Sequence, residues 1–485
     1  MEVRAEFSER HVGLARVPHA PLLRSVDSAT AAAIWVPGAC FRQCSCLATA
    51  VPRKYYLSLS SRSQKITIQM TTQELRERIA EVSSSIAHQE ELLKKLRQDM
   101  SLLQRQLNEA VDPVARLPLE ISSEIFLQCL DPFPSPGESH APTLLLNVCN
   151  TWTRIALSTP ALWASIHIEL PNTQHWKRVL PFWFRRARNR SLSISLSGDL
   201  RYFSDRISSC IWKYASGLRH LLISDDSEDE DEDDEDGQLS ITLFKNTPPD
   251  SLPSLETLTV RGFITDRVFM GPQIMELLLR APNIIEYICD CMEVIDLDES
   301  TTPVVLPTLR RLIFGDDADD DILNHLSLPA LETLSLSMCA VSLDDFLRFL
   351  KRSAPPLKEL VMGFRYVTED SGPLLECLSR IPTLGGFKMW GAHNEIMDHL
   401  LTALADSYDL LPNLHILTIN TRTQEADIPD SFWGSLLRAI STRRIQLHLP
   451  GVKAPPEAVL AAFRQLVVDG IQIYIGSEES NLVAV

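Results

Sequence analysis

The residue types that most often carry out catalysis form no recognisable active-site pattern in this sequence of 485 residues. Gly385-Gly386 lacks the lysine and the spacing of a phosphate-binding loop. Cys289 and Cys291 are separated by one residue, but no second cysteine pair follows at the spacing of a zinc site. The histidines show no metal-ligand spacing, and no Gly-x-Ser-x-Gly sequence offers a nucleophilic serine. We therefore predict no enzyme, no cofactor and no metal.

Composition narrows the class of protein further. The formal net charge of −17 argues against nucleic acid as a ligand, which would need a basic face. The ten cysteines follow no disulfide-framework spacing, and Glu2, Glu6 and Glu9 stand where a secretory signal would carry positive charge. No apolar run approaches the ~20 residues of a membrane span, so no membrane partner is predicted. We expect an intracellular protein of the cytoplasm, the nucleus or both.

A long helix is predicted for residues 73–110, within a coiled-coil segment that we place at 70–112. Its seam positions alternate steps of four and three residues over five heptads, which is typical of a coiled coil. The seam consists of Leu75, Ile79, Val82, Ile86, Gln89, Leu93, Leu96, Met100, Leu103, Leu107 and Ala110. Gln89 is its single polar member. The pattern predicts self-association, although packing on a neighbouring domain of the same chain would also cover such a stripe.

Residues 113–170 hold two further apolar runs, separated by a loop at 131–142. In the first run, Pro118 suits a helix start, and Ile121 and Ile125 begin a stripe that recurs every four residues. The second run is periodic from Leu145 and is ended by Pro160. A unit of this size cannot bury so many apolar side chains well, and the surplus predicts a surface for a partner.

These two runs resemble the F-box, in the form common among fungal F-box proteins. The matching residues are Leu117-Pro118-x-Glu120-Ile121-x-x-x-Ile125-Phe126-x-x-x-Leu130, then Val148-Cys149-x-x-Trp152-x-x-Ile155-Ala156 and Pro160-x-Leu162-Trp163. The resemblance implies a trihelical module that docks on a Skp-family adaptor and, through it, on a cullin–RING ubiquitin ligase. It implies that the adaptor surface is formed or supported by Leu117, Pro118, Glu120, Ile121, Ile125, Phe126, Leu130, Val148, Cys149 and Trp152, and that Trp163 joins this module to the next domain. An ordinary helical hairpin packed inside a larger fold is the alternative interpretation.

Residues 171–485 contain a repeat of the form x-Pro-x-Leu-x-x-Leu-x-apolar. Its prolines stand at 253, 282, 307, 329, 355, 382 and 412, so the spacings are 29, 25, 22, 26, 27 and 30 residues, as in leucine-rich repeats. Each copy predicts a short strand, and most are followed by a helix: 273–280, 343–352, 374–380, 394–405, 432–440 and 457–468. Strands at 445–449 and 471–475 continue the series. Stacking such units predicts a solenoid of parallel strands.

The match to leucine-rich repeats is partial. Only Cys339 stands where that family carries asparagine or cysteine after the strand, so we expect an irregular solenoid. A doubly wound parallel sheet would fit the same alternation of strand and helix. Asp225 to Asp236, with eleven carboxylates in twelve residues, predicts a solvated, disordered insertion. Residues 1–69 carry no sustained period and predict disorder, with an organelle transit segment as the alternative.

The expected fold class is therefore α/β: a coiled-coil helix, a small all-α F-box and an irregular solenoid that resembles leucine-rich repeats. The resemblance implies a substrate-recognition subunit of a Skp–cullin–F-box ubiquitin ligase, whose repeats bind an unknown protein target. The alternative is a scaffold protein that uses the coiled coil and the repeats without coupling to a ligase.

Overall fold

The computed structural model describes residues 72–484, apart from 138, 171–172, 201–202, 204, 227–238, 245–247, 263–266, 292, 298–301, 316–317, 319, 337–341, 365–370, 392, 421–427 and 478–479. The chain divides into two units, Met1–Met70 and Thr71–Val485, and only the second is described. The predicted disorder of residues 1–69 and most of the acidic run therefore lie outside the described residues. So does Cys339, together with the equivalent positions of the other repeats.

Helix α1 spans Thr72–Val111, 40 residues in all, which confirms the helix predicted for 73–110. It ends where Asp112-Pro113 follows, because proline cannot continue a helix. None of its residues is buried, and the apolar seam is exposed along its whole length. Helix α1 thus carries an apolar stripe that the described part of the chain leaves uncovered.

A group of short helices follows, and residues 114–163 are called the helical unit below. It contains η2 (Val114–Arg116), α2 (Leu119–Gln128), α3 (Leu145–Val148), α4 (Asn150–Ser158) and η3 (Pro160–Trp163). Pro118 is the residue just before α2 rather than its first helical residue, and it leaves no N–H unpaired at the helix start. As predicted, the second run ends before Pro160, which instead begins η3.

The rest of the chain is dominated by one sheet, which among the described residues has 13 strands. The strands lie side by side in chain order, and every neighbouring pair is parallel except the last. They are β1 (Ser165–Glu169), β2 (Leu192–Ser197), β3 (Leu218–Ser224), β5 (Thr257–Arg261), β7 (Glu286–Asp290), β10 (Arg311–Phe314), β12 (Thr333–Leu336), β13 (Glu359–Gly363), β14 (Gly386–Trp390), β15 (Ile416–Asn420), β16 (Gln446–Pro450), β17 (Ile473–Ser477) and β18 (Ser480–Asn481). The first strand lies within residues 113–170, ahead of the predicted start of the repeats.

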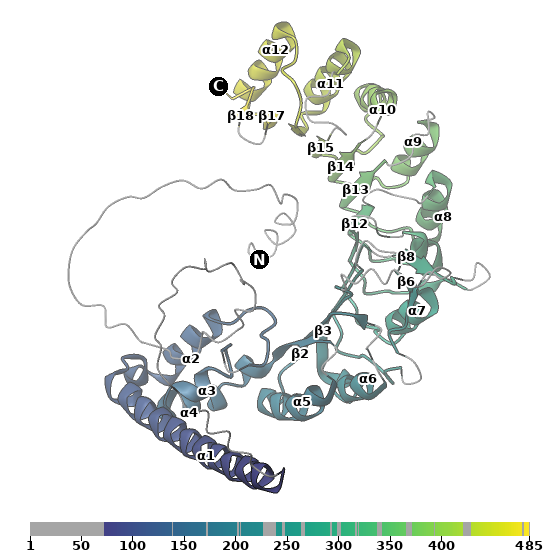
Figure 1. Ribbon diagram of the computed structural model, residues 1–485. Helices are drawn as coiled ribbons and strands as arrows, with labels where there is room; N and C mark the ends of the chain where they lie inside the picture. Colours follow the sequence, from purple (N-terminus) through teal and green to yellow (C-terminus); the bar gives the residue numbers. More distant parts are fainter. Residues whose placement is uncertain are drawn as a thin grey trace, which may run out of the picture. The chain divides into compact units, whose positions relative to one another are not determined.

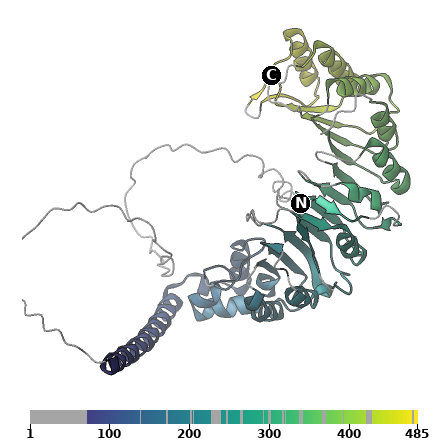
Figure 2. The ribbon, with the colours of Figure 1, turned by 45° about the vertical axis from the view of Figure 1, so that its right-hand side comes forward.

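Helices connect these strands and lie along one side of the sheet (Figures 1 and 2). They are α5 (Thr173–Ala187), α6 (Asp205–Trp212), α7 (Gly271–Leu279), α8 (Leu343–Ser353), α9 (Gly372–Ser379), α10 (Asn394–Asp406), α11 (Asp430–Arg443) and α12 (Glu457–Val468), with the 3-10 turns η5 (Ala215–Gly217) and η6 (Asp321–His325). All six helices predicted after the repeat strands are present. The opposite side of the sheet, which these helices leave uncovered, is called the open face below.

The alternative of a doubly wound sheet is wrong. Such a sheet reverses its strand order at a switch point and carries helices on both faces. Here the order runs from β1 to β18 without a reversal, and the helices stay on one side (Figure 1). The described chain is a mixed α/β structure built on a large and mostly parallel sheet.

Two small sheets were not predicted. One is formed by β4 (Leu239–Ile241), β6 (Arg267–Met270) and β8 (Glu293–Ile295), and the other by β9 (Val304–Val305) and β11 (Leu326–Ser327). Strands of two to four residues are too short to show an alternating apolar pattern. These short strands lie in the connections between strands of the large sheet, and they pair where neighbouring connections lie side by side.

The repeat template identifies the core correctly. In the copy at 328–336, Leu331, Leu334 and Leu336 are fully buried, and the equivalent residues of the other copies are buried as well. Because side chains alternate across a strand, the residues between them face the open side. Stacking apolar residues of one repeat on those of the next builds a continuous core.

A second regularity ties the repeats together, and the sequence analysis missed it. The residue after the template proline often carries a hydroxyl or an amide, which donates a hydrogen bond to a main-chain carbonyl of the preceding repeat. The donors are Ser254 (to Ser216 O, 2.8 Å), Asn283 (to Pro253 O, 2.7 Å), Thr308 (to Pro282 O, 3.0 Å), Thr383 (to Leu357 O, 2.7 Å) and Asn413 (to Pro382 O, 2.8 Å). These bonds satisfy carbonyls at the turn between repeats.

The predicted acidic insertion begins too early. Asp225 is fully buried, and its carboxylate accepts a hydrogen bond of 3.0 Å from the backbone N–H of Leu200. Its own N–H donates to the Arg261 carbonyl at 2.9 Å. A carboxylate with such partners can be buried, whereas the charge count alone suggested a solvated residue.

In the described part of the chain, no helix combines the length and the apolar character that crossing a membrane requires.

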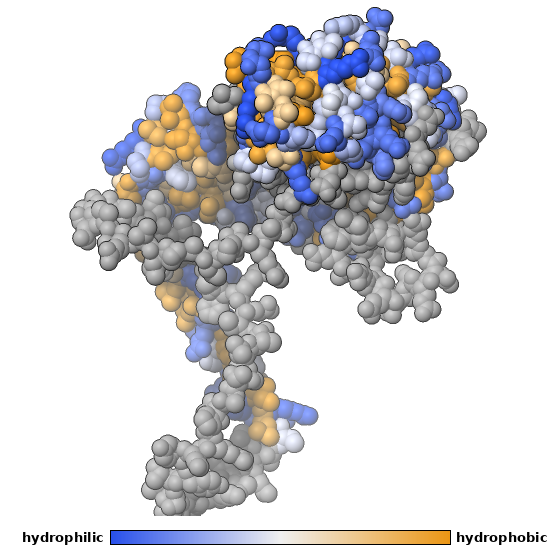
Figure 3. All heavy atoms as spheres, turned by 90° about the horizontal axis from the view of Figure 1, so that it is seen from above, coloured by the Kyte–Doolittle hydropathy of each residue, from blue (hydrophilic) through white to orange (hydrophobic). Residues whose placement is uncertain are grey.

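Seen from above, the C-terminal repeats nearest the viewer present hydrophilic side chains with hydrophobic ones between them (Figure 3).

Candidate docking surfaces

Helix α2 has two distinct faces. Ser122 and Phe126, four residues apart, are buried against the rest of the helical unit. On the other face, Ile121 and Ile125 leave 51% and 39% of their area exposed, and Leu117, which precedes the helix in an extended conformation, leaves 41%. Pro118 and Glu120 are exposed beside them. This aliphatic stripe, called the α2 stripe below, is larger than a solvated helix needs and is typical of a surface that binds a partner.

The other predicted site residues are partly or fully buried in the helical unit. The Phe126 ring packs on the Trp152 ring with centroids 4.8 Å apart, and the Trp152 indole N–H donates to the Asp112 carboxylate. Cys149 is fully buried and caps α4 by accepting the Trp152 backbone N–H at 3.4 Å; burial raises the pKa of its thiol. Leu130 and Val148 are half-buried. The ten predicted residues therefore divide into an exposed set and a set that is partly or fully buried.

One exposed leucine at the start of α2 was missed. Leu119, the first residue of α2, is 48% exposed. The residues three and four positions later are Ser122 and Ser123, so Leu119 has no apolar partner on its own helix. That absence of a partner was the available signal.

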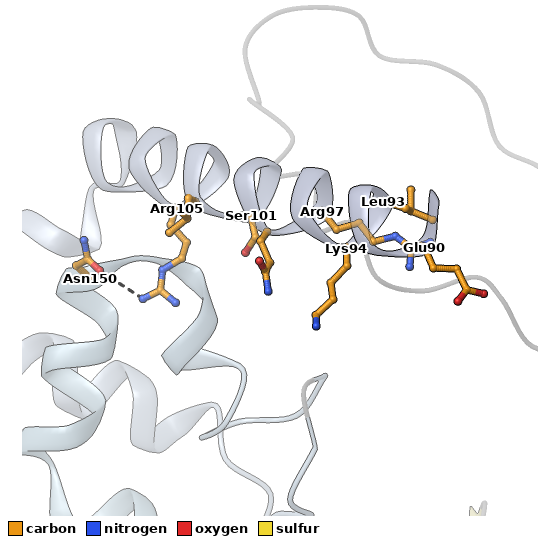
Figure 4. A pocket seen from close by; sticks show the side chains of 9 residues that line it. Glu90, Leu93, Lys94, Arg97, Ser101, Arg105 and Asn150 are labelled. Carbon is orange, nitrogen blue, oxygen red and sulfur yellow. Dashed lines mark hydrogen bonds between the residues drawn. The ribbon is translucent and has the colours of Figure 1, made fainter. Parts of the chain in front are cut away.

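Helix α1 is fastened to the helical unit by four polar side chains near its C-terminal end. Arg105 donates to the Leu146 carbonyl and to the Thr153 hydroxyl, each at 3.0 Å, and to the Asn150 side-chain oxygen at 3.4 Å (Figure 4). The remaining contacts come from Asn108, which donates to Val148 O at 3.0 Å, from Glu109, which accepts from the backbone and side chain of Thr151, and from Asp112. α1 is therefore held at the N-terminal end of α4 by hydrogen bonds rather than by its apolar seam.

We expect this attachment to weaken in acid. The Thr151 hydroxyl and then its backbone N–H hold the pKa of Glu109 below its usual value of 4.5. Because the pKa of Glu109 is lowered in the folded chain, its ionised carboxylate stabilises the attachment fully at pH values above the usual pKa. This stabilisation is lost as the pH falls through the lower pKa of the folded chain. The measurement is hydrogen-exchange protection of the Thr151 amide against pH, compared between the wild-type chain and Glu109→Gln. Loss of protection at the same pH in both chains would contradict this role of Glu109.

A hollow of about 440 Å³ lies on the open face near its C-terminal end. Four adjacent strands line it, and the strand registers bring their side chains together: Lys388 pairs with Thr418, Thr418 with His448, and His448 with Tyr474. The complete lining consists of Lys388, Thr418, Asn420, His448, Pro450 and Tyr474. This set, together with Trp390, is called the C-terminal hollow below.

The C-terminal hollow combines cationic, aromatic and amide groups. The Lys388 ammonium lies 4.5 Å from the ring centroid of Trp390, which is 41% exposed. The His448 and Tyr474 rings are 4.8 Å apart. The side-chain oxygen of Asn420 is buried without a hydrogen-bond partner among the described residues, and so can accept one from a ligand. These groups suit a peptide that brings a carboxylate to the lysine and apolar atoms to the rings.

The residues first considered for chemistry are apart from both surfaces. Cys289 is buried in the core on β7, and Gly385 is placed where a side chain would meet the His415 ring. Across the described ranges, His, Cys, Asp and Glu side chains do not gather in groups of three or more that would hold a metal ion. The arrangement of the described residues offers binding surfaces.

Comparison with known proteins adds no relative: models of known protein families do not match this chain, and a search of the curated proteins also finds no match.

Proposed function

We propose that the chain is the substrate-recognition subunit of a Skp–cullin–F-box ubiquitin ligase. In this proposal, the helical unit is an F-box, α1 is a coiled-coil helix, and the sheet with its helices is an irregular solenoid related to leucine-rich repeats. The α2 stripe docks on a Skp-family adaptor, which links the chain to a cullin. Such an assembly would work in the cytoplasm or the nucleus.

The observation that carries the proposal is the exposure of Leu117, Ile121 and Ile125 on a unit whose core is closed behind them. Phe126 and Cys149 already fill that core, so the stripe has no place in it. When a partner removes exposed aliphatic area of this kind from water, the free energy of binding becomes more favourable by about 25 cal/mol per Å². The resemblance of these residues to the F-box names the adaptor as that partner.

The chain would contribute proximity rather than bond-making. Holding a target close to a ubiquitin donor replaces an encounter in solution by a reaction within one assembly. The repeats would hold the target at the open face, with the C-terminal hollow as its most specific part. The adaptor surface and the hollow belong to different parts of the chain, which allows each to be altered alone.

The proposal is tested by capturing the intact chain from its own cells while the proteasome is inhibited. We expect a Skp-family adaptor and a cullin to be captured, together with ubiquitylated targets. Leu117→Ala combined with Pro118→Ala should remove the adaptor and the cullin. Absence of any Skp-family adaptor, or unchanged adaptor binding in the double variant, would refute the proposal. Capture of the adaptor without a cullin would favour a scaffold role.

A charge reversal in the C-terminal hollow should separate the two surfaces. Lys388→Glu places a carboxylate beside Trp390 and removes the cation that would bind an acidic group of the target. In the same capture, we expect targets to fall roughly tenfold, as for loss of one charge-assisted hydrogen bond, with the adaptor unchanged. Lys351→Glu, on helix α8 rather than on the open face, is the matched control. Equal target capture by the wild-type chain and Lys388→Glu would exclude the hollow as the target site.

A further inference from the structure

We propose that α1 pairs with α1 of a second copy of this chain as a parallel two-stranded coiled coil. This inference goes beyond the proposed function and does not depend on it. The starting observation is that α1 has 40 residues and none of them is buried, while the apolar members of its seam are exposed. An isolated helix with such a stripe gains little from its own hydrogen bonds in water and is stabilised chiefly by packing.

The attachment of α1 to its own helical unit leaves the seam available. With about 100° between successive residues, Arg105, Asn108, Glu109 and Asp112 centre roughly 170° away from the neighbouring seam positions around the helix axis. Figure 4 shows the same relation, because Leu93 points away from the side on which Arg105 reaches Asn150. A second helix can therefore approach the seam while the polar face stays bound to α4.

The seam is long enough for a stable dimer. It runs from Leu75 to Ala110, and 36 residues at 1.5 Å each give roughly 54 Å. With a contact strip about 10 Å wide, each helix would cover roughly 540 Å², or about 1,100 Å² for the pair. This exceeds the ~1,000 Å² expected of a biological interface.

The form of the seam favours a second copy as the occupant. Its strict alternation of four and three residues is the 3.5-residue repeat of a two-helix coil, whereas a helix that packs on a globular domain shows a wider stripe at 3.6. A partner helix must match it over the same length. The next longest described helix, α5, has 15 residues, and it carries buried residues of the core such as Leu180 and Trp183. A second α1 supplies the required heptads.

Gln89 sets the direction. With Ile79 and Ile86 at a positions, Gln89 falls at d, and the residues at all a positions of the seam are apolar. In a parallel pair the two Gln89 amides share a layer and can bond to each other. In an antiparallel pair each would face an a residue, such as Met100, without a partner. That register would place Glu90 near Arg97, but exposed ion pairs contribute less than an unpaired buried amide costs.

The outer positions agree with the parallel arrangement. The g-to-e pairs would be Arg78 with Ser83, Ser85 with Glu90, Leu92 with Arg97, and Asp99 with Gln104. None of these pairs opposes two charges of the same sign, so no repulsion acts against a parallel pair. Two helical units, each bound to the outer side of its own α1, would then lie near the same end of the coil.

Two neighbouring leucines provide a matched test. Leu103 lies in the seam and is 66% exposed, while Leu102 lies beside it outside the seam and is 59% exposed. The full chain, of 54.5 kDa, is sedimented at micromolar concentration as wild type, Leu103→Glu and Leu102→Glu. We expect dimers for wild type and Leu102→Glu, and at least about a 100-fold weaker dimer for Leu103→Glu. A monomeric wild type, or equal dissociation constants for the two variants, would overturn the proposal. Neither side chain is buried within a single copy, so Leu102→Glu should leave the thermal unfolding temperature unchanged, and Leu103→Glu should lower it only through loss of the dimer.

Direction is tested with Leu75→Cys, at the start of the seam. In a parallel pair the two introduced thiols share a layer, and mild oxidation should give a covalent dimer that the wild-type chain does not form. A full antiparallel overlap would separate them by about 50 Å. A non-covalent dimer whose Leu75→Cys variant does not cross-link would overturn the parallel arrangement.

Discussion

Replacing Ile121 with aspartate is expected to weaken binding of a Skp-family adaptor by at least about 100-fold, which is roughly 2.7 kcal/mol. Ile121 lies at the centre of the α2 stripe and is 51% exposed in the free chain. If an adaptor covers the stripe, the aspartate must be buried without a partner, and an unpaired charge in an apolar contact costs several kcal/mol. The measurement is a calorimetric titration of the purified chain with the adaptor.

The stability of the free chain should stay unchanged, since Ile121 contributes to the surface rather than to the core. Leu279→Asp is the matched control, because Leu279 is also an aliphatic helix residue, 61% exposed, but lies on α7. It should bind the adaptor as tightly as the wild type. Wild-type affinity in Ile121→Asp would show that the α2 stripe is not the adaptor surface.

Replacing Trp163 with alanine is expected to destabilise the chain by about 3–5 kcal/mol, as for other buried aromatic residues. Trp163 is fully buried, its ring centroid lies 5.0 Å from that of Trp183 on α5, and its indole N–H donates to Ala156 O at 2.9 Å. It therefore joins the helical unit to the first helix of the repeats, as the sequence led us to expect. The measurement is urea-induced unfolding followed by tryptophan fluorescence and by circular dichroism.

Two controls separate packing from hydrogen bonding and from loss of a tryptophan in general. Trp163→Phe keeps most of the ring contact and should lose about 1 kcal/mol for the missing hydrogen bond plus a smaller cavity term. Trp390→Ala removes a tryptophan that is 41% exposed on β14, and its effect on unfolding should be much smaller. An unfolding midpoint of Trp163→Ala equal to that of the wild type would contradict the role of Trp163 as a joint.

The core positions and the strands of the large sheet were largely predictable from particular residues. Leu334 and Leu336 are apolar at the two-residue spacing of a half-buried strand, and Leu331 precedes that strand. A proline at one phase of each repeat marks the turn before it. Local patterns of this kind determine which residues face the core. The order of the strands then follows because each repeat can bury its apolar face only against its neighbours.

The attachment of α1 and the C-terminal hollow were not predictable in the same way. Arg105, Asn108 and Glu109 look like ordinary outer-face residues, and their partners lie about 40 residues further along the chain. The hollow depends on the registers of four strands, which set Lys388 beside Thr418 and His448 beside Tyr474. Neither relation leaves a periodic signal, since both arise from tertiary packing. The prediction that Asp225 is solvated was wrong for the same reason, since its partner Leu200 is 25 residues away in the sequence.

The antiparallel strand β18 has a consequence for solubility. An uncapped parallel array would offer the free hydrogen-bonding groups of its last strand to any other strand, and edges of this kind promote aggregation. Here Asn481 occupies that position: its amide donates to Ile473 O at 3.1 Å and its oxygen accepts from Ile475 N at 3.2 Å, while Leu482 N donates to Ile475 O at 2.7 Å. Strand β18 and the residues beside it therefore occupy hydrogen-bonding groups of β17 and oppose the addition of another molecule's strands at this border.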